Sequence, residues 1–241
     1  MQYILSRVRR CVDDYNMIED GDTIAVGVSG GKDSLLTLAA MANLRRFYPK
    51  KFDLVAITLD SGTPGLDLSP LDDYCRELEV PYHKIPVPIY EIVFEIRKEK
   101  NPCSLCAKLR RGALNSELNR LGLSKIALGH HFDDAVETML MNLLFEGRIG
   151  CFQPVTYLDR SGITQIRPLL YVQERDVKGA AKRLKLPICP NPCPADGSSR
   201  REEVKNLIRT LQTTYPDLKQ KIFGAIQRYP LEGWDVENLL N

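Results

Sequence analysis

The clearest candidate for chemistry in this chain is a loop between a short apolar run and a helical pattern, Ser29-Gly30-Gly31-Lys32-Asp33-Ser34. Glycines let the backbone turn tightly and approach an anion, while N–H groups and the positive end of the following helix stabilise phosphate oxygens. The kinase-type P-loop differs, because it requires a glycine where Val26 stands and Ser or Thr where Asp33 stands. The segment therefore predicts a phosphate-binding loop of another class.

A second candidate is the segment Gly129-His130-His131-Phe132-Asp133-Asp134, which also follows an apolar run and opens a helical pattern. Two adjacent carboxylates at such a junction suit Mg²⁺ bound against phosphates, or the orientation of a reacting base. The simpler interpretation is that Asp133 and Asp134 cap the helix and favour its dipole. The segment alone leaves both interpretations open.

The cysteines form a third candidate. There are seven, and Cys103-Ser-Leu-Cys106 is a CxxC pair, whereas three residues separate Cys189 from Cys193. A single CxxC fits half a zinc site, a redox pair or a pair of cluster ligands. The amino terminus lacks the features of a secretion signal, so we expect a cytoplasmic protein without a disulfide framework.

Alternating strand and helix patterns must position these groups. Strands are expected near residues 23–28, 54–59, 81–87 and 125–128, and helices near 1–18, 31–48, 68–78, 89–97, 104–121 and 133–145. A hairpin at 155–158 and 163–167, a basic helix at 173–185 and helices from about residue 199 follow. This order predicts an α/β fold with a doubly wound, mostly parallel sheet that binds ligands at the carboxyl ends of its strands.

Composition excludes several classes of protein. The 241 residues carry 33 basic and 31 acidic side chains, a net charge of +2, and are 44% hydrophobic, which excludes a disordered tail or a polybasic arm. No apolar run is long enough to span a membrane. Basic residues occur in local groups, and the group Lys108, Arg110 and Arg111 lies next to the CxxC pair, where phosphate or RNA contact is expected.

The first loop together with the Gly129–Asp134 segment resembles the N-type ATP pyrophosphatases, which cleave ATP to AMP and pyrophosphate. Over residues 20–215, the stretches Cys103–Gly112, Ile126–Asp134 and Ile166–Leu169 resemble the tRNA 2-thiocytidine synthetase family. This resemblance implies an adenine nucleotide α-hydrolase-like PP-loop fold. It also implies an amino-terminal helix over 1–20, an ATP pyrophosphatase domain over 21–170 and a helical carboxy-terminal region over 171–241.

The resemblance further implies a site that uses ATP, Mg²⁺ and a 4Fe-4S cluster. Nucleotide binding is implied for Ser29, Gly30, Gly31, Lys32, Asp33, Ser34, Gly129 and His130. Catalytic roles are implied for Asp33, Arg110, Asp133 and Asp134. Cluster ligation is implied for Cys103, Cys106 and Cys193, with Cys189 as an alternative third ligand.

The implied reaction is thiolation of tRNA. The 2-oxygen of cytidine at position 32 of the anticodon loop attacks the α-phosphorus of ATP, pyrophosphate leaves, and sulfur delivered on the cluster then displaces AMP. The implied partners are tRNA, a second copy of the chain, and a sulfur donor such as a cysteine desulfurase or free sulfide. No membrane partner is expected.

Two departures from the family pattern keep other functions open. Cys193 is followed by proline rather than by Gly-Ser-Gln, and a nearby arginine makes this part more similar to the 2-thiouridine branch. Arg110 stands where that branch has a catalytic lysine, and an arginine suits phosphate contact better than proton transfer. The alternatives are a 2-thiouridine thiolase, a cluster-free ligase of the lysidine-synthetase type, and a non-enzymatic sensor that binds nucleotide.

Overall fold

The computed structural model describes residues 1–98, 102–195, 200–229 and 231. Its centre is a six-stranded sheet with the order β3-β2-β1-β4-β6-β5. The strands are β1 (Asp22–Gly27), β2 (Phe52–Asp60), β3 (Tyr82–Pro86), β4 (Lys125–Ala127), β5 (Val155–Leu158) and β6 (Ile163–Ile166). All neighbours pair in parallel except β5, which pairs antiparallel with β6. The predicted doubly wound, mostly parallel sheet is therefore confirmed.

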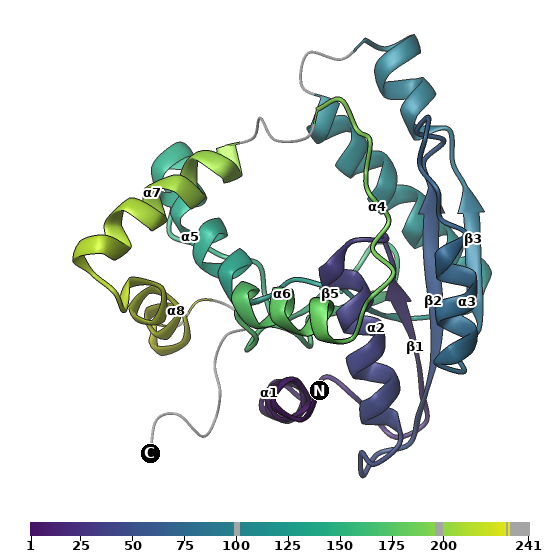
Figure 1. Ribbon diagram of the computed structural model, residues 1–241, viewed down its shortest axis with the longest axis horizontal. Helices are drawn as coiled ribbons and strands as arrows, with labels where there is room; N and C mark the ends of the chain where they lie inside the picture. Colours follow the sequence, from purple (N-terminus) through teal and green to yellow (C-terminus); the bar gives the residue numbers. More distant parts are fainter. Residues whose placement is uncertain (99–101, 196–199, 230, 232–241) are drawn as a thin grey trace.

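Helices surround the sheet and continue beyond it at the carboxy-terminal end (Figure 1). They are α1 (Gln2–Asp14), α2 (Lys32–Arg45), α3 (Pro70–Glu77), η1 (Glu91–Ile96), α4 (Pro102–Arg120), α5 (Phe132–Glu146), α6 (Glu174–Arg183), α7 (Arg200–Thr214) and α8 (Leu218–Arg228). Helices α7 and α8 lie on the opposite side of the molecule from β2 and β3 (Figure 1). None of the helices in the described part of the chain has the length and hydropathy of a membrane span.

The alternation of side chains along β1 builds two cores. Ile24 and Val26 belong to the larger apolar cluster, which also contains residues of α1, α2, α5, α6, α7 and α8. Ala25 points to the other face, where it packs in a smaller cluster with Leu118 of α4. The amino- and carboxy-terminal helices thus share one core with the sheet, and the division at residues 20 and 170 stays a prediction.

Most expected elements form with small shifts in their ends. The helix expected to include Leu68 begins at Pro70, because proline fits the first helical turn, where its missing N–H is not needed. The expected helix over 89–97 is a π-helix over Glu91–Ile96. The helix expected over 104–121 begins at Pro102, so both cysteines of the CxxC pair lie in its first turns.

The chain reverses its direction of travel across the sheet between β1 and β4. From β1 it proceeds to β2 and β3 on one side, and it returns to β4 on the other. Such a switch point leaves an open crevice at the carboxyl ends of the two strands. Both candidate phosphate-site segments, which follow β1 and β4, therefore lie at this crevice.

Candidate active site

The loop after β1 is held by hydrogen bonds of its own side chains. The N–H of Ser29 donates to Ser34 Oγ at 3.0 Å, and Ser34 Oγ lies 3.0 Å from the carbonyl of Gly31. Gly31 is the N-cap of α2, and its carbonyl accepts the N–H of Leu35 at the start of the helix. The loop therefore presents the positive end of α2 to the crevice, as a phosphate-binding loop requires.

Gly30 is required at its position for two reasons. Its φ of +79° lies in the left-handed region, and a Cβ atom there would lie 2.9 Å from Cβ of Cys189. The N–H of Cys189 also donates to the carbonyl of Gly30 at 3.0 Å. The segment that leads to Cys193 is thus attached directly to the phosphate-binding loop.

Gly129 brings the second segment against the first. A Cβ atom at Gly129 would lie 3.0 Å from both the carbonyl carbon of Asp33 and the backbone nitrogen of Ser34. Only a residue without a side chain permits the loop after β4 to approach the first turn of α2 this closely. The two candidate segments therefore form one site.

His131 connects the two segments through its ring. It is the N-cap of α5, where Nδ1 accepts the N–H of Asp134 at 3.4 Å and Asp134 Oδ2 accepts the N–H of His131 at 2.9 Å. An accepting Nδ1 leaves the ring proton on Nε2, which lies 3.5 Å from Asp33 Oδ1. Asp33 and Asp134 are therefore held on either side of one buried imidazole.

The carboxylate of Asp33 suits a cation. Its Oδ2 accepts a hydrogen bond from Lys32 Nζ at 2.9 Å. Its Oδ1 is inaccessible to solvent and accepts no well-formed hydrogen bond from the described residues, since His131 Nε2 lies 3.5 Å away. An unsatisfied carboxylate oxygen beside a phosphate-binding loop is the kind of ligand that Mg²⁺ takes together with phosphate oxygens. The donor set thus fits the Mg²⁺ that the family resemblance implies.

The adjacent residues Asp133 and Asp134 have separate partners. Asp133 is buried, and its Oδ2 accepts the N–H of Glu174 at 2.6 Å while its Oδ1 accepts Lys219 Nζ at 2.7 Å. Asp134 instead contacts His131, and its Oδ1 lies 3.3 Å from Nη1 of Arg201. The structure therefore brings Asp134 to the loop site and joins Asp133 to helices α6 and α8, so the two do not form a single cation-binding pair.

A cavity of about 360 Å³ opens beside the phosphate-binding loop. One wall is apolar and includes Ile57, Leu59 and Leu114, and the guanidinium-bearing residues Arg110 and Arg111 lie on α4 opposite the loop. Its volume and mixed lining are those of a small-molecule site. Arg110 therefore lines the same cavity as Ser29 and Gly31, and its guanidinium is suited to contact a phosphate there.

His130 lies beside the site in a dehydrated aromatic cluster. The centre of its ring lies 5.0 Å from the centre of the Phe152 ring. The Arg167 guanidinium also lies 5.0 Å from the centre of the Phe152 ring. Burial of the His130 ring, helped by the nearby Arg167 charge, lowers its pKa to about 4. The imidazole is therefore neutral at neutral pH, and its Nδ1 has no hydrogen-bond partner among the described residues.

The seven cysteines divide by their surroundings. Cys11 and Cys75 are buried in the core, and burial raises the pKa of Cys75 to about 11. Cys151 donates to the carbonyl of Ala135, and burial raises its pKa to about 12. Cys189 is buried against Gly30. Of the three remaining thiols, Cys103 is exposed and Cys106 and Cys193 are partly exposed.

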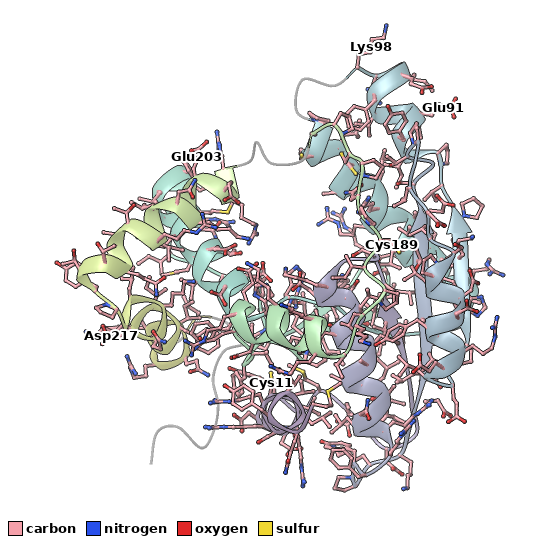
Figure 2. All side chains as sticks on the ribbon, in the orientation of Figure 1. Cys11, Glu91, Lys98, Cys189, Glu203 and Asp217 are labelled. Atoms are coloured by element: carbon pink, nitrogen blue, oxygen red, sulfur yellow. The ribbon has the colours of Figure 1, made fainter. Side chains whose placement is uncertain are left out.

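These three thiols belong to segments that lie side by side. The stretch around Cys189, which leads to Cys193, runs along α4 (Figure 2), and Cys189 and Asn191 line the same cavity as Arg110 and Arg111. Free thiols are the donors that iron–sulfur clusters take. Within residues 1–98, 102–195, 200–229 and 231, however, no three Cys, His, Asp or Glu side chains are arranged as a metal-binding group. The cluster assignment stays a prediction.

Sequence reasoning missed three residues of the site. His131 was passed over in favour of His130, although the His-x-x-Asp spacing of a helix N-cap could have identified it. Glu174 and Arg201 come from α6 and α7 and contact Lys32 and Asp134, respectively. No local pattern marks these two, because their partners lie far away in the chain.

Comparisons with known proteins show which family this chain belongs to. The family model described as a PP-loop domain matches residues 4–211. The chain is 40% identical to a tRNA-cytidine(32) 2-sulfurtransferase of Geobacter sulfurreducens, over 92% of this chain and 88% of that protein. It is also 40% identical to a tRNA-cytidine(32) 2-sulfurtransferase of Shewanella sp. strain ANA-3, over 96% and 77% of the two chains. The solved structure of the U34-tRNA thiolase NcsA from Methanococcus maripaludis, with its 4Fe-4S cluster, superposes with a TM-score of 0.76. It has 25% identity, and the match covers 96% of this chain and 80% of that one.

Proposed function

Because this chain belongs to the PP-loop family, and within it to the tRNA 2-thiocytidine synthetase family, we propose that it thiolates cytidine 32 of tRNA at the expense of ATP. The observation that carries the proposal is the close approach of Gly129 to Asp33 and Ser34. It joins the phosphate-binding loop, Asp33 and Asp134 into one site, and Ser29 and Gly31 of the same loop line the cavity that Arg110 also lines. Such a site activates a carbonyl oxygen as an adenylate.

Different residues of the chain contribute to different parts of the adenylation step. The N–H groups of the loop and Lys32 would hold the phosphates, and Asp33 would be a ligand of the Mg²⁺ bound with them. The cytidine 2-oxygen forms a bond to the α-phosphorus, and the bond from the α-phosphorus to pyrophosphate breaks. Arg110 at the cavity wall stabilises the negative charge on the adenylate. A sulfur nucleophile then forms the C2–S bond as the C2–O bond breaks and AMP leaves.

We assign the thiols of Cys103, Cys106 and Cys193 to a 4Fe-4S cluster. Three thiolate ligands would leave one iron of a bound cluster without a protein ligand, and the cluster would then supply an open coordination position for sulfur. The attachment of Cys189 to Gly30 supports this assignment, because it holds the stretch leading to Cys193 beside α4 and the nucleotide cavity.

The cluster assignment predicts a spectroscopic change. Replacing Cys103, Cys106 or Cys193 by alanine in anaerobically prepared protein removes the visible absorbance of the cluster, because each variant loses one of only three ligands. Cys151→Ala, whose thiol lies in a hydrogen bond to Ala135, is the matched control and keeps the absorbance. Full absorbance in all three ligand variants contradicts the assignment, and loss in Cys189→Ala but not in Cys193→Ala moves the third ligand to Cys189.

The proposed function is tested by mass spectrometry of tRNA nucleosides. Cells that lack the gene lose 2-thiocytidine, and wild-type protein or Arg209→Ala restores it, since Arg209 is exposed on α7. Asp33→Ala does not restore it, because the variant has lost the carboxylate beside the phosphates. Loss of 2-thiouridine instead of 2-thiocytidine contradicts the choice of base, and an unchanged nucleoside profile contradicts thiolation altogether.

The proposal includes a cytoplasmic homodimer that receives sulfur from a cysteine desulfurase or from free sulfide. The end of α5 and the loop after it support the dimer, because Leu144 on the helix and Ile149 in the loop are 52% and 70% exposed. Sedimentation of the active protein tests this part, and a monomeric mass at the assay concentration contradicts it.

A further inference from the structure

The carboxylate of Glu174, in the first turn of α6, lies among three lysines. Its Oε1 is 3.5 Å from Lys32 Nζ, 3.2 Å from Lys178 Nζ and 3.9 Å from Lys205 Nζ. The three amines come from three different helices: α2, α6 and α7. Among the described residues, no other carboxylate contacts amines from so many elements.

These lysines keep the carboxylate charged. Burial by itself raises the pKa of Glu174, but the hydrogen bond from Lys178 and the charges of Lys205 and Lys32 outweigh it and lower the pKa to about 2. Glu174 is therefore an anion throughout the neutral range. Its side chain is only 19% exposed, so water screens these contacts less than it would on an open surface.

The backbone of Glu174 is fixed as well. Its N–H donates to Asp133 Oδ2 at 2.6 Å, and the other oxygen of Asp133 accepts from Lys219 of α8. Asp133 thus supplies the acceptor for the first turn of α6, where Gln173 provides no side-chain cap. This explains why Asp133 points away from Asp134: it anchors the residue that carries the carboxylate.

Lys32 is the partner through which Glu174 reaches the active site. Its amine lies between Asp33 Oδ2 at 2.9 Å and Glu174 Oε1 at 3.5 Å. A lysine side chain has four rotatable bonds, and holding it in one geometry costs conformational entropy. Two carboxylates on either side select the conformation in which the amine remains beside the phosphate-binding loop.

We propose that Glu174 is a positioning residue that holds Lys32 ready for the phosphates of ATP, and that Asp133 serves the reaction by fixing Glu174 rather than by touching substrate. This inference rests on the proposed use of ATP by the loop, and it extends that function to two elements outside the loop. It does not depend on which base is thiolated.

A purely structural role for Glu174 is the competing explanation, because its contact with Lys178 lies within α6 and its contact with Lys205 joins α6 to α7. The two roles differ in one respect. If Glu174 acts through Lys32, its effect on ATP binding disappears when Lys32 has no amine. If Glu174 only stabilises the fold, its effect on ATP binding is the same with and without that amine.

The test is a double-mutant cycle on the dissociation constant of MgATP, measured by calorimetry on the full-length, anaerobically prepared protein without tRNA. Glu174→Gln weakens MgATP binding by about fivefold to tenfold in the wild-type background, a coupling typical of interacting neighbours. In the Lys32→Met background the same change has no further effect. Glu174→Asp, which keeps the charge on a shorter side chain, recovers part of the affinity.

Asp176→Asn is the matched control, because Asp176 lies in the same turn of α6 and its carboxylate accepts an exposed hydrogen bond from the Tyr3 hydroxyl, away from Lys32. It leaves MgATP binding unchanged. Unaltered or tighter binding by Glu174→Gln overturns the inference, as does an equal loss in both backgrounds. Because the assay contains no tRNA, an unchanged nucleoside profile in cells would contradict the proposed thiolation without affecting this result.

Discussion

At the scale of single residues, the chemistry of the site depends on which partner each charged group has. Asp133 and Asp134 are neighbours in the chain, yet one is joined to α6 and α8 and the other to His131 and Arg201. Buried charges are tolerated only when they are paired, so each carboxylate is tied to the element that supplies its partner. The role of each residue therefore follows from its contacts rather than from its place in the motif.

The lowered pKa of the His130 ring predicts that the stability of the protein depends on pH. Its pKa of about 4 in the folded protein lies below its ordinary value of 6.5, mainly because its ring is buried. Folding therefore favours the neutral ring, and this contribution is fully present above pH 6.5 and is lost as the pH falls towards 4. The free energy of unfolding of the cluster-free protein decreases by about 1–2 kcal/mol between pH 6.5 and 5.

Urea unfolding at several pH values measures this decrease. His130→Gln, which does not titrate, has a smaller slope over the same interval, because its side chain remains neutral in both states. An identical slope for the wild type and the variant contradicts the assignment of the effect to His130.

At the scale of elements, the site forms where the starts of two helices meet. Helix α2 begins after the loop that follows β1, and α5 begins after the loop that follows β4. The two strands are adjacent in the sheet, so their following loops meet at one edge. Gly129 sets how closely they approach, because no side chain separates it from the backbone of Asp33 and Ser34.

Gly129→Ala tests this approach. The added methyl group meets backbone atoms at 3.0 Å, which do not move aside easily, so we expect a loss of about 1–3 kcal/mol in the free energy of unfolding, together with weaker MgATP binding. Gly112→Ala is the control, because it lies inside α4 with nothing within 4 Å of the added atom. It stabilises the protein by about 0.5–1 kcal/mol through helix propensity. Equal stability of the two variants in urea unfolding contradicts the proposed close contact.

At the scale of the whole molecule, the carboxy-terminal helices are part of the site and not an addition to it. Helix α7 begins with Arg200 and Arg201, and Arg201 Nη1 lies 2.9 Å from Glu137 Oε2 and 3.3 Å from Asp134 Oδ1. Glu137 is buried, so its charge depends on this partner and on Lys205 at 3.9 Å. The arrangement ties the region after Cys193 to the helix that carries Asp134.

The variant Arg201→Ala measures how strongly the region after Cys193 is attached to α5. The change leaves the carboxylate of Glu137 buried with only the more distant Lys205, and we expect a loss of about 1–3 kcal/mol in the free energy of unfolding. Adding Glu137→Gln recovers part of the loss, because a neutral amide costs less to bury. Arg209→Ala, which removes an exposed pair with Glu202, changes stability by less than about 0.5 kcal/mol. Equal effects of the two arginine variants in urea unfolding contradict this attachment.

Much of this architecture can be predicted from the residues in order. The periodic apolar patterns place the strands and helices nearly where they form, because burial on one face of an element leaves a repeat that is local in sequence. The loop Ser29–Ser34 is recognisable because glycine, lysine and serine between a strand and a helix together indicate phosphate binding. The start of α3 at Pro70 and the π-helix over Glu91–Ile96 are less predictable, since packing decides such ends.

The sequence by itself determined the fold class, the phosphate-binding loop, the family and the CxxC pair, because each is read from periodic patterns or short motifs and from their order along the chain. Only the tertiary structure decided that His131 links Asp33 to Asp134, that Asp133 belongs to α6, and that Glu174 faces Lys32. These pairings join residues from different elements, and they depend on the order of strands in the sheet. No local pattern encodes that order, because it is set by the burial of the two faces of the sheet as a whole.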